Sequence, residues 1–419
     1  MNLIKTSFYT SLSTGITFLT GFVTTKVVAV KIGPEGMAYY GQFVNTTSIL
    51  AMLGTGAITT GVVKYLAEFS DNKEQQQKLI STAFIVVFVS SLVISLFTMA
   101  CSTVFSTAAF KTKEFWIVYL VYGFCLTAVS LNAIFNCILN GLKFIKRLTI
   151  INITASLVGM TSLVVLASTL GLVGVLINVS VVGLVMMCIN IVMFRKWGIR
   201  WRFKLNQFDI PILKKLFAFS LMAVVSGTVV PVMQILVRSK IITSLSLQEA
   251  GYWQAVTRIS DYYLGFISSV LVVYYMPKLS ELKTSKSIRK EILYGYKMIL
   301  PVVGALSLSI WFLKDFIIHI LFTPDFTGMR GLFAFQLIGD FLKIGSWLLA
   351  YLMLAKAMTK TFIVTEILFG ISFVIFSYIF INRYGVVGAT YAFALNYLIY
   401  WIVMEVIAKK YLNEESQTK

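Results

Sequence analysis

The chain of 419 residues is poor in the side chains on which most enzyme and metal sites depend. It has one histidine, His319, and it shows no HExxH motif, no phosphate-binding P-loop and no GxSxG nucleophile motif. Without a P-loop we expect no ATP hydrolysis by the chain itself. Any energy must then come from an ion gradient, the membrane potential or a substrate gradient. The sequence predicts neither an enzyme nor a bound cofactor or metal.

Cysteine and charge are also scarce. The four cysteines fall in apolar stretches at unrelated spacings, which predicts small packing side chains and no disulfide or metal site. Charged residues make up 13% of the chain and apolar residues 58%. Apolar runs of about 20 residues recur along the whole length, which is typical of membrane-spanning helices. The fold class predicted is an all-α polytopic membrane protein.

Hydropathy predicts about twelve transmembrane helices. Their expected ranges are 7–30, 37–66, 80–106, 115–139, 148–170, 173–194, 212–237, 250–275, 292–322, 327–354, 361–382 and 385–408. The first run is too long for a cleaved signal peptide, and we interpret it as a retained helix.

Basic residues gather in alternate connections between these helices. The two termini and the even-numbered connections carry about 24 of the 36 lysines and arginines, with the richest stretches at 195–215 and 278–290. The positive-inside rule then predicts that both termini lie in the cytoplasm. The net charge of +19 is explained by topology and by anionic lipid head groups, so nucleic acid is not an expected partner.

The two halves of the chain echo one another. AYYGQFV at 38–44 and AGYWQAV at 250–256 share Ala, Tyr, Gln and Val at matching positions. A second pair of similar segments, GLVG at 171–174 and GVVG at 385–388, is separated by nearly the same number of residues as the first pair. A duplicated unit with an even number of helices predicts parallel repeats that face a central cavity.

The duplication sets the expected domain boundaries. They are an N-lobe of six helices over 1–195, a basic cytoplasmic linker over 196–211, a C-lobe of six helices over 212–410 and a cytoplasmic tail over 411–419.

Ionisable residues inside the expected helices are the main candidates for a site. Each costs at least ~2.5 kcal/mol in the membrane, so each needs a partner or water. Arg258 with Asp261, and Asp340 with Lys343, are opposite charges three residues apart that can neutralise each other on one helix face. Lys26 has no acidic neighbour on its own helix, and Glu366 is a further embedded acid. A slight cationic surplus would suit an anionic head group such as a diphosphate.

Helix breakers give one further candidate feature. Pro231 lies inside the seventh expected helix, four residues after Gly227. This pair predicts either a moving hinge or a static kink, and the sequence leaves both open.

Several blocks resemble a known family. They are Lys26–Val30 with Gly33–Gly36, Gly251–Gln254 with Ile259–Asp261, Pro277–Ser280, and Leu332–Gly345, which reads LFAFQLIGDFLKIG. Together they resemble the bacterial polysaccharide flippases of the MATE-like exporter superfamily.

The resemblance implies a function and a set of residues. The family's substrate is an oligosaccharide on undecaprenyl diphosphate, such as an O-antigen or enterobacterial common antigen unit, moved across the bacterial inner membrane by alternating access. Lys26 and Arg258 occupy places like those of the family's diphosphate-binding cations. Asp261, Gln336, Asp340 and Lys343 fall in matching blocks without an assigned role. A glycan polymerase and a chain-length regulator are the expected protein partners.

Two other functions remain as alternatives. A MATE-type drug antiporter coupled to cations should have an acid-dominated cavity. A glycan-polymerising enzyme should need a large outer loop, whereas no expected outer connection exceeds about 15 residues.

Overall fold

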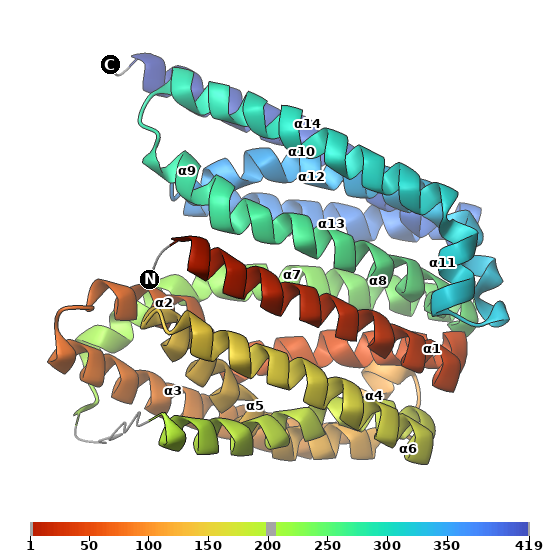
Figure 1. Cartoon of the computed structure of the whole chain (residues 1–419). Coiled ribbons are helices and arrows are strands. Elements are labelled where there is room, and N and C mark those ends of the chain that lie inside the picture. The colour runs from red at the N-terminus through yellow and green to blue at the C-terminus, as the bar shows by residue number, and fades with distance from the viewer. Residues whose placement is uncertain (1–2, 198–206, 418–419) are drawn as a thin grey trace. The chain divides into compact units, whose positions relative to one another are not determined.

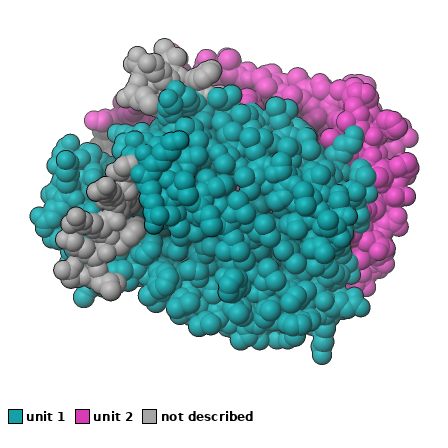
Figure 2. Space-filling model, turned by 60° about the horizontal axis from the view of Figure 1, so that its bottom comes forward, with its two compact units in different colours: residues 1–32, 39–232 teal, residues 33–38, 233–419 magenta. Residues whose placement is uncertain are grey.

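A computed structural model describes residues 3–197 and 207–417, and nearly all of these are helical (Figure 1). Helices satisfy their own backbone hydrogen bonds, which is what apolar runs need in hydrocarbon. The chain forms two compact units (Figure 2). Unit 1 is Met1–Ile32 with Tyr39–Val232, and unit 2 is Gly33–Ala38 with Met233–Lys419.

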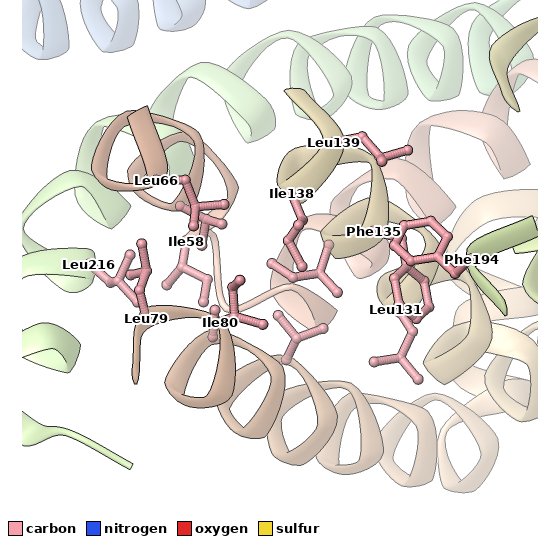
Figure 3. Packing of buried hydrophobic residues seen from close by; sticks show 14 of the residues in the cluster. Ile58, Leu66, Leu79, Ile80, Leu131, Phe135, Ile138, Leu139, Phe194 and Leu216 are labelled. Carbon is pink, nitrogen blue, oxygen red and sulfur yellow. The ribbon is translucent and has the colours of Figure 1, made fainter. Parts of the chain in front are cut away.

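Unit 1 is built from helices that surround an aliphatic core. Its elements are α1 (Leu3–Gly54), α2 (Thr59–Glu68), α3 (Lys73–Ala100), α4 (Ser102–Phe110), α5 (Trp116–Gly141), α6 (Ile145–Lys196) and the first part of α7 (Ile210–Ser244). Figure 3 shows how Ile58 and Leu66 meet Leu79, Ile138 and Leu216 in this core. The helices α2, α3, α5 and α7 are therefore joined by a single apolar cluster.

Unit 2 contains the rest of the chain. Its elements are the end of α7, α8 (Leu247–Val270), a π-helical segment η2 (Leu271–Tyr275), α9 (Met276–Glu281), α10 (Ser285–Phe312), α11 (Lys314–Leu321), a 3-10 segment η3 (Pro324–Leu332), α12 (Phe333–Ala355), α13 (Thr359–Tyr384) and α14 (Val387–Gln417). The π-helical segment ends two residues before Pro277, which has no N–H to continue the regular ladder.

The long apolar helices confirm a polytopic membrane protein. Within the described residues, nine helices are long and apolar enough to cross a membrane. Two of these, α1 and α6, contain a non-helical glycine, at Gly33 and Gly171, and each overlaps two of the expected spans. A further expected span coincides with α8, which contains Arg258 and Asp261. The number of twelve crossings stays a prediction.

Three expected elements differ in their bounds. The second expected span is divided into the end of α1 and the separate helix α2, because Gly56 and Ala57 between them have positive φ. The ninth is broken at Leu313 between α10 and α11. The expected tail 411–419 is helical as far as Gln417, as the end of α14.

The duplication is visible in the backbone. Gly171 and Gly385 are the first residues of the GLVG and GVVG echoes. Gly171 has φ 55° and ψ −131°, and Gly385 has φ 64° and ψ −152°. Residues with a side chain rarely adopt this conformation, so both positions favour glycine. In both units a second glycine follows three residues on, at Gly174 and Gly388, and packs against the carbonyl oxygen eight residues before it.

The turns that enter these paired segments match as well. Lys143 has φ 59° and Ala357 has φ 53°, and these two residues are separated by the same stretch of chain as Gly171 and Gly385. Phe144 N donates to Leu139 O at 2.8 Å, and Met358 N donates to Met353 O at 2.8 Å. The turn before the first half of α6 and the glycine at its end are therefore as far apart in sequence as the turn before α13 and the glycine that follows α13. Neither copy has an insertion or a deletion in this segment.

The domain boundaries expected from the sequence stay a prediction. Most of the expected linker 196–211 lies outside the described residues, since 198–206 are not described. The compact units divide later in the chain, inside α7 between Val232 and Met233, and a short piece of α1, Gly33–Ala38, belongs to unit 2. There Gly251 of α8 packs against the carbonyl of Pro34, since a Cβ on Gly251 would lie 1.9 Å from that oxygen.

We predict that Gly174→Ala and Gly388→Ala each destabilise the protein. The added Cβ would lie 2.0 Å from Leu166 O and 2.2 Å from Phe380 O, and backbone atoms cannot move aside cheaply. Overpacking of this kind costs about 1–3 kcal/mol. The measurement is the midpoint of thermal unfolding in detergent. Gly15→Ala is the control, since nothing lies within 4 Å of its Cβ; midpoints equal to the control would contradict the tight packing.

Candidate functional site

Buried polar side chains gather in unit 2 on α7, α8, α12 and α13. Asp340 on α12 and Arg238 on α7 are both fully buried, with 0% of their surface exposed. A buried charge inside a membrane helix is costly unless its partners hold it in place. The surroundings of each charge therefore show what the cluster is built to stabilise.

The Asp340 carboxylate is held by neutral donors from two helices. Ser260 Oγ and Tyr263 OH, both on α8, donate to Asp340 Oδ2 at 2.6 and 2.7 Å. Gln336 Nε2, one turn earlier on α12, donates to Oδ1 at 3.2 Å. Both oxygens are satisfied by these donors, and Lys343 acts on the carboxylate as a nearby charge. The pairing of Asp340 with Lys343 stays a prediction.

Lys343 lies among aromatic rings. Its Nζ is 4.9 Å from the ring centroid of Trp347, 5.5 Å from that of Tyr397 and 5.7 Å from that of Phe393. Contacts of an ammonium with ring faces are favourable by about 0.5–2 kcal/mol each, most of all away from water. The carboxylates of Asp261, Asp340 and Glu366 attract the same ammonium.

Arg238 is the charged residue that the sequence analysis misplaced. The expected seventh span, 212–237, ends one residue before it, but α7 continues to Ser244 and Arg238 lies inside the helix. Its guanidinium donates from Nη2 to Gln254 Oε1 and lies 5.3 Å from the Trp253 ring centroid. The apolar pair Ile241 and Ile242 after Lys240 was the signal that the helix continues.

Asp261 is the most accessible member of the cluster. Its side chain is exposed, and it interacts electrostatically with Lys343, Arg258 and Arg238. Arg258, three residues earlier on α8, is half-buried, and its guanidinium lies 5.4 Å from the Tyr262 ring centroid. One exposed carboxylate therefore lies within the electrostatic reach of three cations.

Glu366 on α13 completes the group. It is half-buried, and Tyr400 OH of α14 donates to its Oε1 at 3.4 Å. The cluster thus brings together Arg238, Arg258 and Lys343 with Asp261, Asp340 and Glu366, so cations and carboxylates are equal in number.

The remaining candidates belong to unit 1. Lys26 on α1 has an exposed side chain. Gly227 on α7 packs against α1, because a Cβ there would lie 2.7 Å from Met52 Sδ. Pro231 lies inside α7, directly before the boundary between the units.

Tyr263, Phe393 and Tyr397 are contact residues that the sequence does not single out. Nothing in the sequence distinguishes these aromatic residues from those that line a membrane interface. As for metal ions, the described part of the chain contains no group of three or more His, Cys, Asp or Glu side chains able to hold one.

The fold matches solved transporters. A MATE family multidrug transporter of the MOP superfamily, in an inward-facing conformation, superposes with a TM-score of 0.76 at 15% identity, covering 96% of each chain. The lipid II flippase in an inward closed conformation gives a TM-score of 0.74 at 18% identity over 97% of this chain and 87% of that one. The protein therefore has the fold of the MATE-like transporters, as the sequence predicted.

The sequence comparison identifies the family. The family model described as polysaccharide biosynthesis protein matches residues 3–283, about two thirds of the chain. The lipid III flippase of Escherichia coli (strain K12) is 29% identical over 402 residues, which are 96% of this chain and 97% of the relative. The chain belongs to this polysaccharide biosynthesis protein family.

We predict that Tyr263→Phe lowers the midpoint of thermal unfolding in detergent. The change removes one of three donors to a buried carboxylate, and hydrogen bonds to charged groups contribute about 1.5–3 kcal/mol. Tyr274→Phe is the matched control, because Tyr274 is exposed on the same run of helix. Equal midpoints for the two variants would show that Tyr263 does not stabilise Asp340.

Proposed function

We propose that the protein is a flippase, a transporter and not an enzyme, that moves an oligosaccharide linked to undecaprenyl diphosphate from the cytoplasmic to the periplasmic leaflet. The observation that carries this proposal is the match to the lipid III flippase over almost the whole of both chains. The family assignment and the shared fold with the lipid II flippase support it.

The physical task is to take sugars past hydrocarbon. Each sugar hydroxyl that loses its hydrogen bonds in an apolar medium costs several kcal/mol, about 4–8 for transfer from water to an alkane. A polar path through the protein, opened alternately to each side, removes this cost while the polyprenyl chain stays in lipid. Polar groups on the membrane helices of unit 2 support such a path.

The proposed holders of the diphosphate are Lys26 and Arg258. Both are cations on apolar helices, and neither is fully buried. An anionic diphosphate satisfies such cations with short, charge-assisted hydrogen bonds.

The charge cluster of unit 2 is the proposed place of energy coupling. We propose Asp261, Gln336, Asp340, Lys343 and Glu366 as the residues that link substrate movement to an ion or proton. Asp340 is held by three donors, so Asp261, which is exposed and faces three cations, is the candidate that changes partners.

A MATE-type drug antiporter is the alternative function. A site for cationic drugs should be dominated by acids, whereas the cluster of unit 2 balances three carboxylates with three cations. The likeness to the MATE transporter is one of fold, at 15% identity. The flippase is therefore the better-supported function.

The movement itself is proposed to bend α7 at Gly227 and Pro231. The boundary between the compact units next to Pro231 supports a hinge there, since proline removes one backbone hydrogen bond of the helix. In this scheme the lobes are residues 1–195 and 212–410. The membrane is the bacterial inner membrane, where a glycan polymerase and a chain-length regulator would receive the product.

We predict that Lys26→Ala and Arg258→Ala each reduce surface glycan at least about tenfold, because each removes a charge-assisted bond of more than ~1.4 kcal/mol to the diphosphate. The variants are expressed in a strain that lacks its own copy of the gene, and surface glycan and inner-leaflet carrier are measured. Lys31→Ala, another exposed cation on α1, is the control and should display normal glycan. Normal display by both test variants would refute the diphosphate site and leave the flippase assignment standing.

We predict from the distribution of basic residues that alkaline phosphatase fused after Lys419 is inactive and that green fluorescent protein fused there is fluorescent. Phosphatase inserted between Lys111 and Lys113, in an expected outer connection, should be active. Active phosphatase at the C-terminus would reverse the proposed orientation.

A further inference from the structure

A cavity in unit 1 has no role in the scheme above. It has a volume of about 400 Å³ and lies between the first part of α1 and the first part of α6, which run side by side (Figure 1). This volume falls within the ~300–1,000 Å³ of small-molecule sites. We call it the α1–α6 pocket.

Five of its seven described lining residues have uncharged polar side chains. They are Ser13, Thr14, Thr17, Asn152 and Ser156. Thr17 Oγ1 and Ser156 Oγ form a hydrogen bond of 3.1 Å from one helix to the other. Among the described residues none bonds to the side-chain amide of Asn152, which leaves its donors and its acceptor available to a ligand. Phe18 adds an aromatic ring to the same wall.

This lining suits one class of ligand. The amide of Asn152 within a membrane segment needs partners, and in a cavity of this size water or a polar ligand can supply them. The described residues of the lining include no ionisable group, so a charged ligand would find no counter-charge among them. An uncharged molecule rich in hydroxyls, with an apolar ring face for Phe18, matches both features.

The internal repeat shows how the same position differs in unit 2. Counted from the paired turns at Lys143 and Ala357, Asn152 and Glu366 hold the same place in the two copies. By the same register Val129 on α5 corresponds to Lys343 on α12. Unit 1 has amide and valine side chains where unit 2 has a carboxylate and an ammonium.

We propose that the α1–α6 pocket binds an uncharged sugar residue of the lipid-linked oligosaccharide, through Asn152, Thr17 and Ser156 with Phe18 against the ring. The pocket therefore selects the saccharide, while charged groups elsewhere hold the diphosphate. This proposal rests on the flippase function proposed above.

The test compares two carriers on the purified full-length protein in detergent. Binding of undecaprenyl diphosphate and of undecaprenyl-diphosphate-linked N-acetylglucosamine is measured by native mass spectrometry. The wild type should bind the sugar-bearing carrier more tightly. Asn152→Leu combined with Thr17→Val should lower that affinity about tenfold, as expected for the loss of one or two hydrogen bonds, and leave the bare carrier unaffected.

Two controls separate binding from folding. Thr161→Val removes an exposed hydroxyl on the same helix outside the pocket, where it only bonds back to its own helix, and should behave as wild type. Asn152→Gln keeps the amide and should retain part of the preference for the sugar. The midpoint of thermal unfolding is measured for every variant.

The outcomes distinguish the two proposals. An undiminished sugar preference in the double variant, or an equal loss for both carriers, would overturn the saccharide pocket and leave the flippase function intact. Failure of the folded wild type to bind either carrier would overturn both.

Discussion

A carboxylate inside a membrane helix persists only where other groups replace the water that it has lost. In this protein Asp340 meets that requirement through Ser260, Tyr263 and Gln336. The hydrogen bonds from Ser260 and Tyr263 to Asp340 fix α8 against α12. The same two helices carry Arg258, Asp261 and Lys343. Neutral donors hold the deepest acid, so the charges around it are not all consumed in static ion pairs.

The duplication gives two copies of one arrangement of helices, whose side chains differ at equivalent positions. The chain turns in the same way at Gly171 and at Gly385, where φ is positive in both units. Both positions favour glycine, because a side chain there would strain the backbone. Between the matching turns, Asn152 stands where Glu366 stands in the other copy. Equivalent positions of the two copies therefore carry different polar chemistry, an uncharged amide in unit 1 and a carboxylate in unit 2.

Much of this architecture could be predicted from the sequence. Apolar runs identify the membrane class, the GLVG and GVVG echoes identify the repeat, and charges in apolar runs identify Asp261, Asp340, Lys343 and Glu366. Arg238 was missed because its neighbours Ser239 and Lys240 are typical of a helix end. The rings around Lys343 were missed because Phe393 and Tyr397 lie on another helix, and only tertiary packing brings them to the ammonium. Sequence patterns find charges in a membrane, but not the neutral groups that hold them.

The proposed function requires that this chain carry a sugar-bearing diphosphate lipid across a bilayer. The direct measurement uses proteoliposomes with undecaprenyl-diphosphate-linked N-acetylglucosamine in the outer leaflet and follows the protection of the sugar from an added membrane-impermeant lectin, with and without a pH gradient. We expect the sugar to become protected faster than in protein-free vesicles. Folded, carrier-binding protein that gives no faster protection under either condition would contradict it.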